Sequence, residues 1–480
     1  MNADLSPALL KRFKAIVGSA GIVTDADALA PALTEWRGLF AGRTPALIAP
    51  ATPAEVAKIL AICQQERIGV VPQGGNTGLV GGAMPASTPE RAEILLSARR
   101  MNAIRDLDPD NYTITVEAGC ILADIQAAAT DADRFFPLSL GSEGSCQIGG
   151  NISTNAGGTN VLRYGNTRDL VMGLEVVLAD GRILSGLRGL RKDNTGYDLK
   201  QLFIGAEGTL GFITAATCKL FPQPRSIAAA WVAVPNPEAA MRLNSKARRL
   251  LGDQLIALEL INRLALDMVL ATIADTRDPL DPSGDWSMLL ELGSTEPGVA
   301  ADVQLEAFLA AAIKEGIVTD AMLAQSDSQR DDLWRIRHSI SEAQKNTGAG
   351  IKHDISVPVS RIGEFLLQAQ QFALERVPGI KVVAFGHMGD GNLHYNLNQP
   401  DHMERNEFLA YWEEISMGIH TLAAELGGSF SAEHGIGVLK VGELARLRGG
   451  VELELMQQLK LTLDPHGIMN PGKLFRAGNS

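Results

Sequence analysis

The chain has 480 residues, 46% of them hydrophobic, which is enough for a large globular protein of two or three domains. Its formal charge of −12 at pH 7 argues against nucleic acid or an anionic membrane surface as a partner. No signal peptide is recognisable at the start of the sequence, and no stretch has the uninterrupted apolar length of a membrane helix. The 4 cysteines lack C-x-x-C spacing, which argues against a disulfide framework or a thiolate zinc site. These features predict a soluble, cytoplasmic protein.

Three glycine-rich loops interrupt the first 220 residues, which otherwise read as short strands. The first loop, 73–82, follows a predicted strand at 69–72, and the others span 141–158 and 193–211. Clustered backbone N–H groups in such loops can bind phosphate, although the first loop is neither a G-x-G-x-x-G turn opening a helix nor a P-loop. Each loop alone has the alternative interpretation of a structural turn. Together they predict a long, polyphosphate-bearing ligand.

A different pattern begins after residues 221–224, where two prolines predict a linker. Short apolar strands then alternate with amphipathic helices, which predicts an α+β domain with one helical layer on a sheet. The predicted strands are 227–234, 256–261 and 286–292, and the predicted helices are 236–251, 262–272 and 297–315. A helix at 403–426 and a short strand at 429–432 are expected to follow.

The segment Gly-His-Met-Gly-Asp-Gly-Asn-Leu-His (386–394) carries the strongest chemical signal. Asp390-Gly391 predicts a two-residue hairpin turn, which would pair His387 directly with His394. Imidazoles on opposed residues, with Cβ atoms roughly 4.5–5.5 Å apart, could share one ion. Glu433-His434 adds a carboxylate and a spare base, and two His plus one Glu is a ligand set of catalytic zinc. The alternative is a hydrogen-bonded surface pair, because all 8 histidines follow Arg337.

At the glycine loops the chain resembles the FAD-linked oxidoreductases of the vanillyl-alcohol oxidase type, over nearly its whole length. The resemblance implies an α+β fold with three parts. These are an FAD-binding domain of two α+β subdomains after a helical lead-in (1–221), an α+β cap domain that contacts substrate (222–428) and a C-terminal segment that returns to the flavin (429–480). Some members bind flavin covalently through a histidine where Asn76 stands, so non-covalent FAD is expected.

The same resemblance implies a set of FAD contacts. The pyrophosphate would be held by the first loop, the flavin ring and ribityl chain by the second, and the adenine side by the third, with one residue joining from the C-terminal segment. The implied residues are Pro72, Gly74, Gly75, Asn76, Thr77 and Gly78; Gly144, Ser145, Gly149, Gly150, Asn155, Ala156 and Gly157; Glu207, Gly208 and Ile213; and Asn470.

The histidine segment and Ala-Glu-His-Gly (432–435) resemble the D-2-hydroxy-acid dehydrogenase branch of these enzymes, most closely the D-2-hydroxyglutarate dehydrogenases. This implies that His387, His394 and Glu433 bind Zn²⁺ or another divalent metal, which eases loss of the substrate's hydroxyl proton. His434 would contact the substrate and take that proton as general base. The C2 hydride would pass to N5 of FAD, converting D-2-hydroxyglutarate to 2-oxoglutarate. Asn396 would share the strand face of His394 and touch the substrate.

A dicarboxylate substrate needs a second anionic anchor. Arg337 and Ser341 stand four apart on a predicted helix at 334–343, and Lys352 lies on a predicted strand at 350–357. The family uses Arg, Thr and Lys at this spacing, so Ser341 in place of Thr would broaden specificity toward D-malate or D-lactate. The alternative for Arg337 is a solvated helix charge. The other histidines are expected to be structural or on the surface: His338, His353, His402, His420 and His466.

Several functions compete at this point. The leading one is a zinc-assisted, FAD-dependent D-2-hydroxyglutarate dehydrogenase. A D-lactate or glycolate dehydrogenase of the same build would not need the anchor of Arg337, Ser341 and Lys352. A non-catalytic flavin-binding electron-relay subunit need not keep metal ligands and His434 together, and a pure metal-binding module leaves the glycine loops unexplained. The expected partners are an electron-transfer flavoprotein or quinone as electron acceptor, and a second copy in a homodimer.

Overall fold

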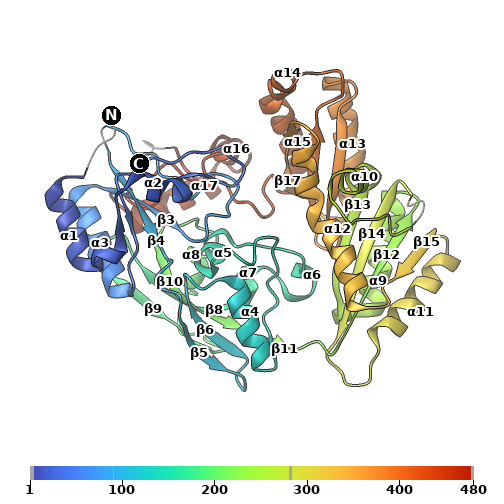
Figure 1. Ribbon diagram of the computed structural model, residues 1–480, viewed down its shortest axis with the longest axis horizontal. Helices are drawn as coiled ribbons and strands as arrows, with labels where there is room; N and C mark the ends of the chain where they lie inside the picture. Colours follow the sequence, from blue (N-terminus) through green and yellow to red (C-terminus); the bar gives the residue numbers. More distant parts are fainter. Residues whose placement is uncertain (1–4, 90, 281–283, 477–480) are drawn as a thin grey trace. The chain divides into compact units, whose positions relative to one another are not determined.

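A computed structural model describes residues 5–89, 91–280 and 284–476 of the chain (Figure 1). The backbone divides into two compact units. Unit 1 comprises residues 1–158, 165–223 and 433–480, and unit 2 comprises residues 159–164 and 224–432. Among the described residues, none of the helices combines the length and the apolar character needed to cross a lipid bilayer.

Unit 1 begins with a small, mostly parallel sheet. Strands β2 (Leu47–Ile48), β4 (Glu93–Ser97) and β3 (Gly69–Gln73) run parallel, and β1 (Ile22–Val23) adds to β2 antiparallel. Helix α3 (Pro53–Glu66) is capped by Thr52, whose hydroxyl accepts a hydrogen bond from the backbone N–H of Glu55. It packs against α1 (Pro7–Val17). Strand β4 is buried along its whole length, as parallel strands usually are.

A five-stranded antiparallel sheet follows in the same unit. Its order is β5 (Ile104–Asp108), β6 (Thr113–Glu117), β10 (Phe212–Lys219), β8 (Val171–Val177) and β9 (Ile183–Gly186). The end of the chain also belongs to unit 1, with α16 (Val441–Leu447), α17 (Val451–Leu463) and a parallel bridge from Met469 to Val70 of β3. The two sheets correspond to the two α+β subdomains that the family resemblance implies.

Unit 2 is built on one eight-stranded antiparallel sheet. Its order is β15 (Asp320–Leu323), β12 (Ser226–Val234), β14 (Trp286–Ser294), β13 (Leu255–Asn262), β18 (Lys381–His387), β19 (Asn392–Asn398) and β16 (Gly350–Ile351), with β17 (Asp354–Ser356) also paired to β19. The strands predicted at 227–234, 256–261 and 286–292 are confirmed.

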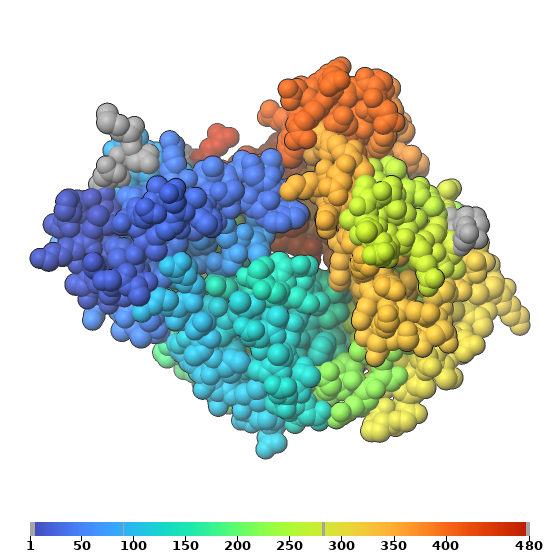
Figure 2. Space-filling view, in the orientation of Figure 1, coloured from blue at the N-terminus to red at the C-terminus, as the bar shows by residue number. Residues whose placement is uncertain are grey.

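Helices cover both faces of this sheet, so the expected single helical layer is wrong. One face packs on α9 (Pro237–Leu251), α11 (Ala301–Lys314), α13 (Ile362–Arg376) and α15 (Trp412–Glu425). The other face packs on α10 (Arg263–Thr272) and α12 (Asp327–Asn346), which lie side by side in Figure 2. The reason lies in the central strands, where residues of both phases are apolar: Leu260 faces one core and Ile261 the other.

Two predictions at the end of unit 2 need correction. The predicted helix at 403–426 is broken at residues 410–411 into α14 (Arg405–Leu409) and α15. The predicted strand at 429–432 forms only a single bridge, from Ser429 to Ser356 of β17. Gly427, with φ of +79°, turns the chain out of α15, a conformation that glycine adopts without steric cost.

The four cysteines Cys63, Cys120, Cys146 and Cys218 are free thiols and all are buried. Burial raises the pKa of Cys120 to about 11 and that of Cys218 to about 12. Because the thiolate is the reactive form, we expect the native protein to react only slowly with a thiol-specific disulfide reagent at pH 8. The measurement is the released chromophore with time, with guanidinium-unfolded protein as the control that titrates all four thiols. Rapid labelling of the native protein would contradict this burial.

Candidate functional site

The predicted FAD-binding loops come together in unit 1. Gly75 of the first loop lies against the second loop, because a Cβ added there would be 2.1 Å from the carbonyl oxygen of Ser145. Gly208 of the third loop, with φ of +70°, lies against Pro72, where an added Cβ would be 2.8 Å away. Asn470 of the C-terminal segment reaches the third loop, since its Nδ2 donates to the carbonyl oxygen of Glu207 at 2.6 Å. Four segments distant in sequence therefore meet at one place.

Bare backbone and unpaired polar atoms mark this region as suited to a ligand. Gly144 and Gly150 have no atom within 4 Å of the point where a Cβ would stand. Among the described residues, the buried Oε1 of Gln147 and the buried Oδ1 atoms of Asn151 and Asn470 have no hydrogen-bond partner within the protein. Buried polar atoms are normally paired, so these acceptors fit a ligand that brings hydroxyl or N–H donors. The ribityl hydroxyls and ring N–H of FAD are donors of this kind.

The other predicted FAD residues have diverse settings. Asn76 has φ of +56° and its Nδ2 donates to the carbonyl oxygen of Thr34 at 3.0 Å. Asn155 ends the short helix α5 (Ile148–Thr154) in the left-handed conformation, and its Oδ1 accepts from the N–H of Arg168 at 2.8 Å. Ile213 is buried in β10 beside an irregularity in the pairing with β8. The role of Asn76, Asn155 and Ile213 in FAD binding stays a prediction.

Glu207 fixes the start of the C-terminal segment to the third loop. Its buried carboxylate accepts hydrogen bonds from the N–H groups of Ile436 and Gly437 at 2.7 and 2.8 Å. Burial raises the pKa of Glu207, although the two N–H groups favour its charged form. An added Cβ at Gly435 would be 2.7 Å from Oε1 of Glu207, so the close approach also depends on glycine.

We expect Glu207→Gln to loosen this segment and weaken FAD retention. The amide has one acceptor oxygen for two donors, and an unsatisfied buried N–H costs about 1–3 kcal/mol. Thermal unfolding followed by the fluorescence of released flavin should shift down by several degrees. Glu66→Gln is the control, because Glu66 pairs with Arg12 on the surface, where an ion pair contributes little. An unchanged transition in Glu207→Gln would contradict this role.

The hairpin with the two predicted metal-binding histidines is longer than expected. His387 pairs with Asn392 and His394 pairs with Phe385, so the predicted direct pairing of the histidines is wrong. The carbonyl oxygen of His387 accepts from the N–H of Gly391 at 3.1 Å, which closes a longer turn over residues 388–391. The register differs by two residues, which keeps both side chains on the same sheet face. As diagonal neighbours, the two rings have centroids 5.8 Å apart.

Glu259 of β13 connects one of these histidines to the predicted anion anchor. Its Oε1 lies 2.5 Å from Nδ1 of His387, and its Oε2 accepts from Nε of Arg337 at 2.5 Å. Burial alone would raise the pKa of Glu259, but the charges of Arg337 and His387 and the two hydrogen bonds lower it well below its usual range. The Arg337 guanidinium also lies over the Phe385 ring, 4.8 Å from its centroid. Arg337 is therefore buried, and the alternative of a solvated helix charge is wrong.

Three other predicted substrate residues, Ser341, Lys352 and Asn396, lie on the same side of the sheet as α12. Lys352 donates from Nζ to the carbonyl oxygen of Ser341 at 3.3 Å, which brings these two predicted anchors together. Asn396 shares the face of His394, as predicted from strand periodicity. Its Nδ2 donates to Oε1 of Gln344 at 2.8 Å and its Oδ1 accepts from the N–H of His353 at 3.0 Å. Both ends of the Asn396 amide thus have hydrogen-bond partners within the protein. Contact of Asn396 with the substrate stays a prediction.

A second buried carboxylate stands beside His394. Asp354 of β17 pairs with His394 in the ladder, and its Oδ1 lies 3.8 Å from Nδ1 of that residue. The carbonyl oxygen of Asp354 accepts from the N–H of Ala432 at 3.2 Å. Glu433 and His434 follow Ala432 directly in the sequence. Within unit 1, Oε1 of Glu433 accepts from the N–H of Gly158 at 2.7 Å, at the end of the second glycine loop.

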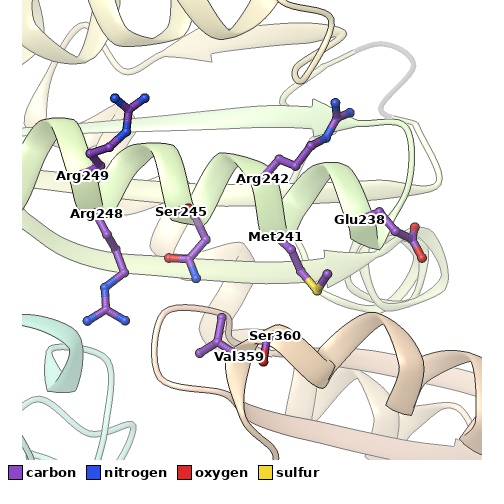
Figure 3. Close-up of a pocket in the computed structure, with 9 residues that line it drawn as sticks. Glu238, Met241, Arg242, Ser245, Arg248, Arg249, Val359 and Ser360 are labelled. Atoms are coloured by element: carbon purple, nitrogen blue, oxygen red, sulfur yellow. The ribbon is translucent and has the colours of Figure 1, made fainter.

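A pocket of about 780 Å³ lies on α9 of unit 2 and has a different character (Figure 3). Met241 and Arg248 project from the helix toward Val359, whereas Arg242 points to the other side. Arg248 also approaches the hairpin turn, with Nη1 at 3.5 Å from the carbonyl oxygen of Gly389. Of the described residues that line this pocket, none is a predicted site residue. The predicted site residues Arg337 and His387 lie on the opposite sheet face, which packs on α10 and α12.

Glu259 and Asp354 were missed in the sequence, although a signal exists for the first. Glu259 is the only charged residue in the strand Leu-Ile-Ala-Leu-Glu-Leu-Ile-Asn (255–262). A charge inside an apolar strand must be paired when buried, so its position alone indicates an unusual partner. Asp354 has no comparable signal, because it follows the polar residues Lys352 and His353 and is not an isolated charge in an apolar strand.

Comparison with known proteins agrees with this arrangement. Residues 44–186 match the FAD binding domain family, and residues 223–474 match the C-terminal domain of FAD linked oxidases. Two solved structures share the fold. The structure of p-cresol methylhydroxylase has a TM-score of 0.76 and 16% identity, over 98% of this chain and 97% of that one. The 4-ethylphenol oxidase of Gulosibacter chungangensis has a TM-score of 0.75 and 18% identity, over 100% of this chain and 99% of that one. The predicted fold class is confirmed.

Curated relatives are similar over nearly the whole chain. The probable mitochondrial D-2-hydroxyglutarate dehydrogenase of Oryza sativa subsp. indica is 39% identical over 96% of this chain and 81% of its own length. The mitochondrial D-2-hydroxyglutarate dehydrogenase of Bos taurus is 39% identical over 95% and 81%. The D-2-hydroxyglutarate dehydrogenase of Stutzerimonas stutzeri (strain A1501) is 36% identical over 98% and 99%.

These relatives also correct one expectation. The composition and the start of the sequence predict a cytoplasmic protein, but the matching plant and animal proteins carry the word mitochondrial in their names. The predicted cytoplasmic location is therefore wrong. Charge and hydropathy indicate whether a protein surface suits an aqueous environment. They do not distinguish the cytoplasm from the mitochondrial matrix, because both are aqueous.

The glycine loops, the two-sheet FAD-binding unit and the matches over both halves of the chain lead to one conclusion. The chain belongs to the FAD-linked oxidases of the vanillyl-alcohol oxidase type and, within them, to the D-2-hydroxy-acid dehydrogenases.

Proposed function

We propose that the chain oxidises D-2-hydroxyglutarate to 2-oxoglutarate, with non-covalent FAD as hydride acceptor and a divalent metal, zinc in first place. The observation that carries this proposal is the carboxylate of Glu259, which binds both His387 and Arg337. A predicted metal ligand and a predicted anion anchor therefore stand on either side of one side chain. D-2-Hydroxyglutarate carries a carboxylate at each end and needs both groups, whereas D-lactate and glycolate need only the metal.

The proposed metal ligands are His387, His394 and Glu433. Imidazole and carboxylate are donors that zinc and several other divalent metals accept. Among the described residues, the group of potential metal ligands comprises Asp354, His394, Glu433 and His434 and does not include His387. Asp354, whose Oδ1 lies 3.8 Å from Nδ1 of His394, is therefore a further candidate ligand. The metal, when bound, would supply positive charge beside the substrate's hydroxyl oxygen, which favours loss of the hydroxyl proton.

His434 is the proposed general base. An imidazole titrates near neutral pH, so it can accept the hydroxyl proton and release it to solvent between turnovers. FAD, when bound, would supply the acceptor for the hydride that leaves C2 of the substrate. Arg337, Ser341 and Lys352 would hold the distal carboxylate and so fix C2 relative to the base. The hydrogen bond to Glu259 engages Nε of Arg337, and the two Nη groups of a guanidinium suit a carboxylate.

Further parts of the proposal concern specificity and partners. Ser341 offers a hydroxyl without the methyl group of threonine, so D-malate is a proposed second substrate. Electrons would leave the reduced flavin to an electron-transfer flavoprotein or a quinone, and the chain would form a homodimer. FAD is proposed to be non-covalent because Asn76 has no nucleophilic nitrogen. Acid precipitation should then release all flavin into the supernatant.

The experiment that tests the function is anaerobic mixing of the FAD-loaded protein with D-2-hydroxyglutarate, D-malate, D-lactate and glycolate, before and after chelation. We expect D-2-hydroxyglutarate to bleach the flavin absorbance rapidly, chelation to abolish the bleaching, and added zinc to restore it. Bleaching by D-lactate or glycolate alone would refute the dicarboxylate anchor. No bleaching by any of the four in metal-replete protein would favour the non-catalytic electron-relay function.

A further inference from the structure

Glu259 occupies an unusual position for a carboxylate. It lies in the middle of β13, between apolar neighbours, and its side chain is only 1% exposed. Each oxygen has one partner of its own, Nδ1 of His387 and Nε of Arg337. Burying a charge in a sheet is costly unless it is paired and hydrogen-bonded, so the site requires both partners.

The carboxylate also determines how His387 presents its ring. An ionised carboxylate only accepts hydrogen bonds, so Nδ1 of His387 must carry a proton. In that tautomer Nε2 holds the lone pair that a metal would use. Metal-binding histidines commonly donate their second N–H to a carboxylate, which fixes both the tautomer and the ring orientation. On its other side the same carboxylate holds the guanidinium plane of Arg337 against Phe385.

We infer that Glu259 is a positioning residue that orients the metal-binding histidine and the substrate-binding arginine together. This inference rests on the proposed function. The two oxygens of the Glu259 carboxylate hold the imidazole of His387 and the guanidinium of Arg337. Glu259 would therefore set the distance between the metal end and the distal-carboxylate end of the substrate site. Glu259 touches neither metal nor substrate in this account, and acts through His387 and Arg337.

The neighbouring strand provides a matched control. Glu291 of β14 projects from the same sheet face, and its Oε2 accepts from Nε1 of Trp334 at 2.6 Å. Trp334 and Arg337 both belong to α12, so each glutamate connects the sheet to the same helix. Only Glu259 also binds a histidine. Glu291→Gln therefore perturbs the contact of sheet and helix without removing the bond to His387.

The experiment compares Glu259→Gln, Glu259→Asp and Glu291→Gln with the wild type. Metal-depleted, FAD-loaded proteins are titrated with zinc against a chromogenic chelator, and thermal unfolding is recorded for each protein. Loss of a carboxylate that orients a ligating histidine typically weakens metal affinity about 10–100-fold. We expect a loss in this range for Glu259→Gln, partial recovery for Glu259→Asp, and affinity within about twofold of wild type for Glu291→Gln. Excess zinc should restore part of the turnover of Glu259→Gln.

Three results would overturn the inference. The first is unchanged zinc affinity in folded Glu259→Gln, or in Glu259→Asp if the glutamine variant does not fold. The second is an equal loss in Glu291→Gln, which would assign the effect to docking of α12. The third is a wild type that binds no zinc, which would overturn the proposed metal site as well. A fourth result separates the inference from the proposed substrate. If the wild type binds zinc but does not oxidise D-2-hydroxyglutarate, and Glu259→Gln binds zinc more weakly, the positioning role stands and only the proposed substrate is refuted.

Discussion

Replacing Glu433 by glutamine is expected to leave a folded, yellow protein with little bound metal and turnover reduced by about 100-fold or more, since a metal supplies several kcal/mol of charge stabilisation. Glutamine matches glutamate in size and keeps an oxygen that can accept from the N–H of Gly158, now held at 2.7 Å from Oε1. The change therefore removes mainly the negative charge. Metal content by elemental analysis and flavin reduction by D-2-hydroxyglutarate check the two parts separately.

A control within the same segment separates this effect from general damage. Glu443 of α16 forms a surface pair with Arg446, with 2.6 Å between Oε2 and Nη2. Glu443→Gln should retain both metal and turnover, because exposed pairs contribute little. Full metal content together with full activity in Glu433→Gln would show that Glu433 is not a ligand. Gly157 constrains this site as well, since an added Cβ there would lie 2.7 Å from Oε1 of Glu433.

The fold of unit 2 was largely predictable because its signals are local. The predicted strand 227–234 is apolar at nearly every position and appears as β12 (Ser226–Val234). The predicted helix 236–251 appears as α9 (Pro237–Leu251), where Asn236 caps the first turn by accepting from the N–H of Ala239. The predicted number of helical layers was wrong. Strands whose side chains are apolar on both faces do not indicate which face each helix covers.

The contacts between the candidate site residues could not be predicted from the sequence, and the roles of these residues stay predictions. The hairpin histidines are close, although the turn 388–391 shifted their register by two residues. Glu259 was missed because its partners are remote, 128 positions away for His387 and 78 for Arg337. A local pattern reveals an isolated charge in an apolar strand but not which distant group neutralises it. Family resemblance named the residues, and only the three-dimensional arrangement joined His387 to Arg337.

Arg337 should decide which substrate the enzyme prefers. Truncating one partner of a buried, hydrogen-bonded charge pair costs about 2–5 kcal/mol, which corresponds to roughly 30- to 5000-fold in affinity. We expect Arg337→Met to lower kcat/KM for D-2-hydroxyglutarate by an amount in this range. The value for D-lactate, which has no distal carboxylate, should change far less. The ratio of the two values, measured by flavin reduction with saturating zinc, is the diagnostic quantity.

Arg337→Met also leaves Glu259 buried without its cation, which by itself costs about 3–5 kcal/mol of stability. Arg337→Lys avoids this, because its ammonium can still pair with Glu259 but cannot offer the planar pair of Nη donors. The lysine variant should therefore stay folded and still lose selectivity. Arg335→Met is the control, since Arg335 lies exposed on the same helix and donates to the carbonyl oxygen of Ala274. If the substrate ratio is the same in wild type and Arg337→Lys, the guanidinium serves only the buried pair, and a D-lactate or glycolate dehydrogenase becomes the better account of this chain.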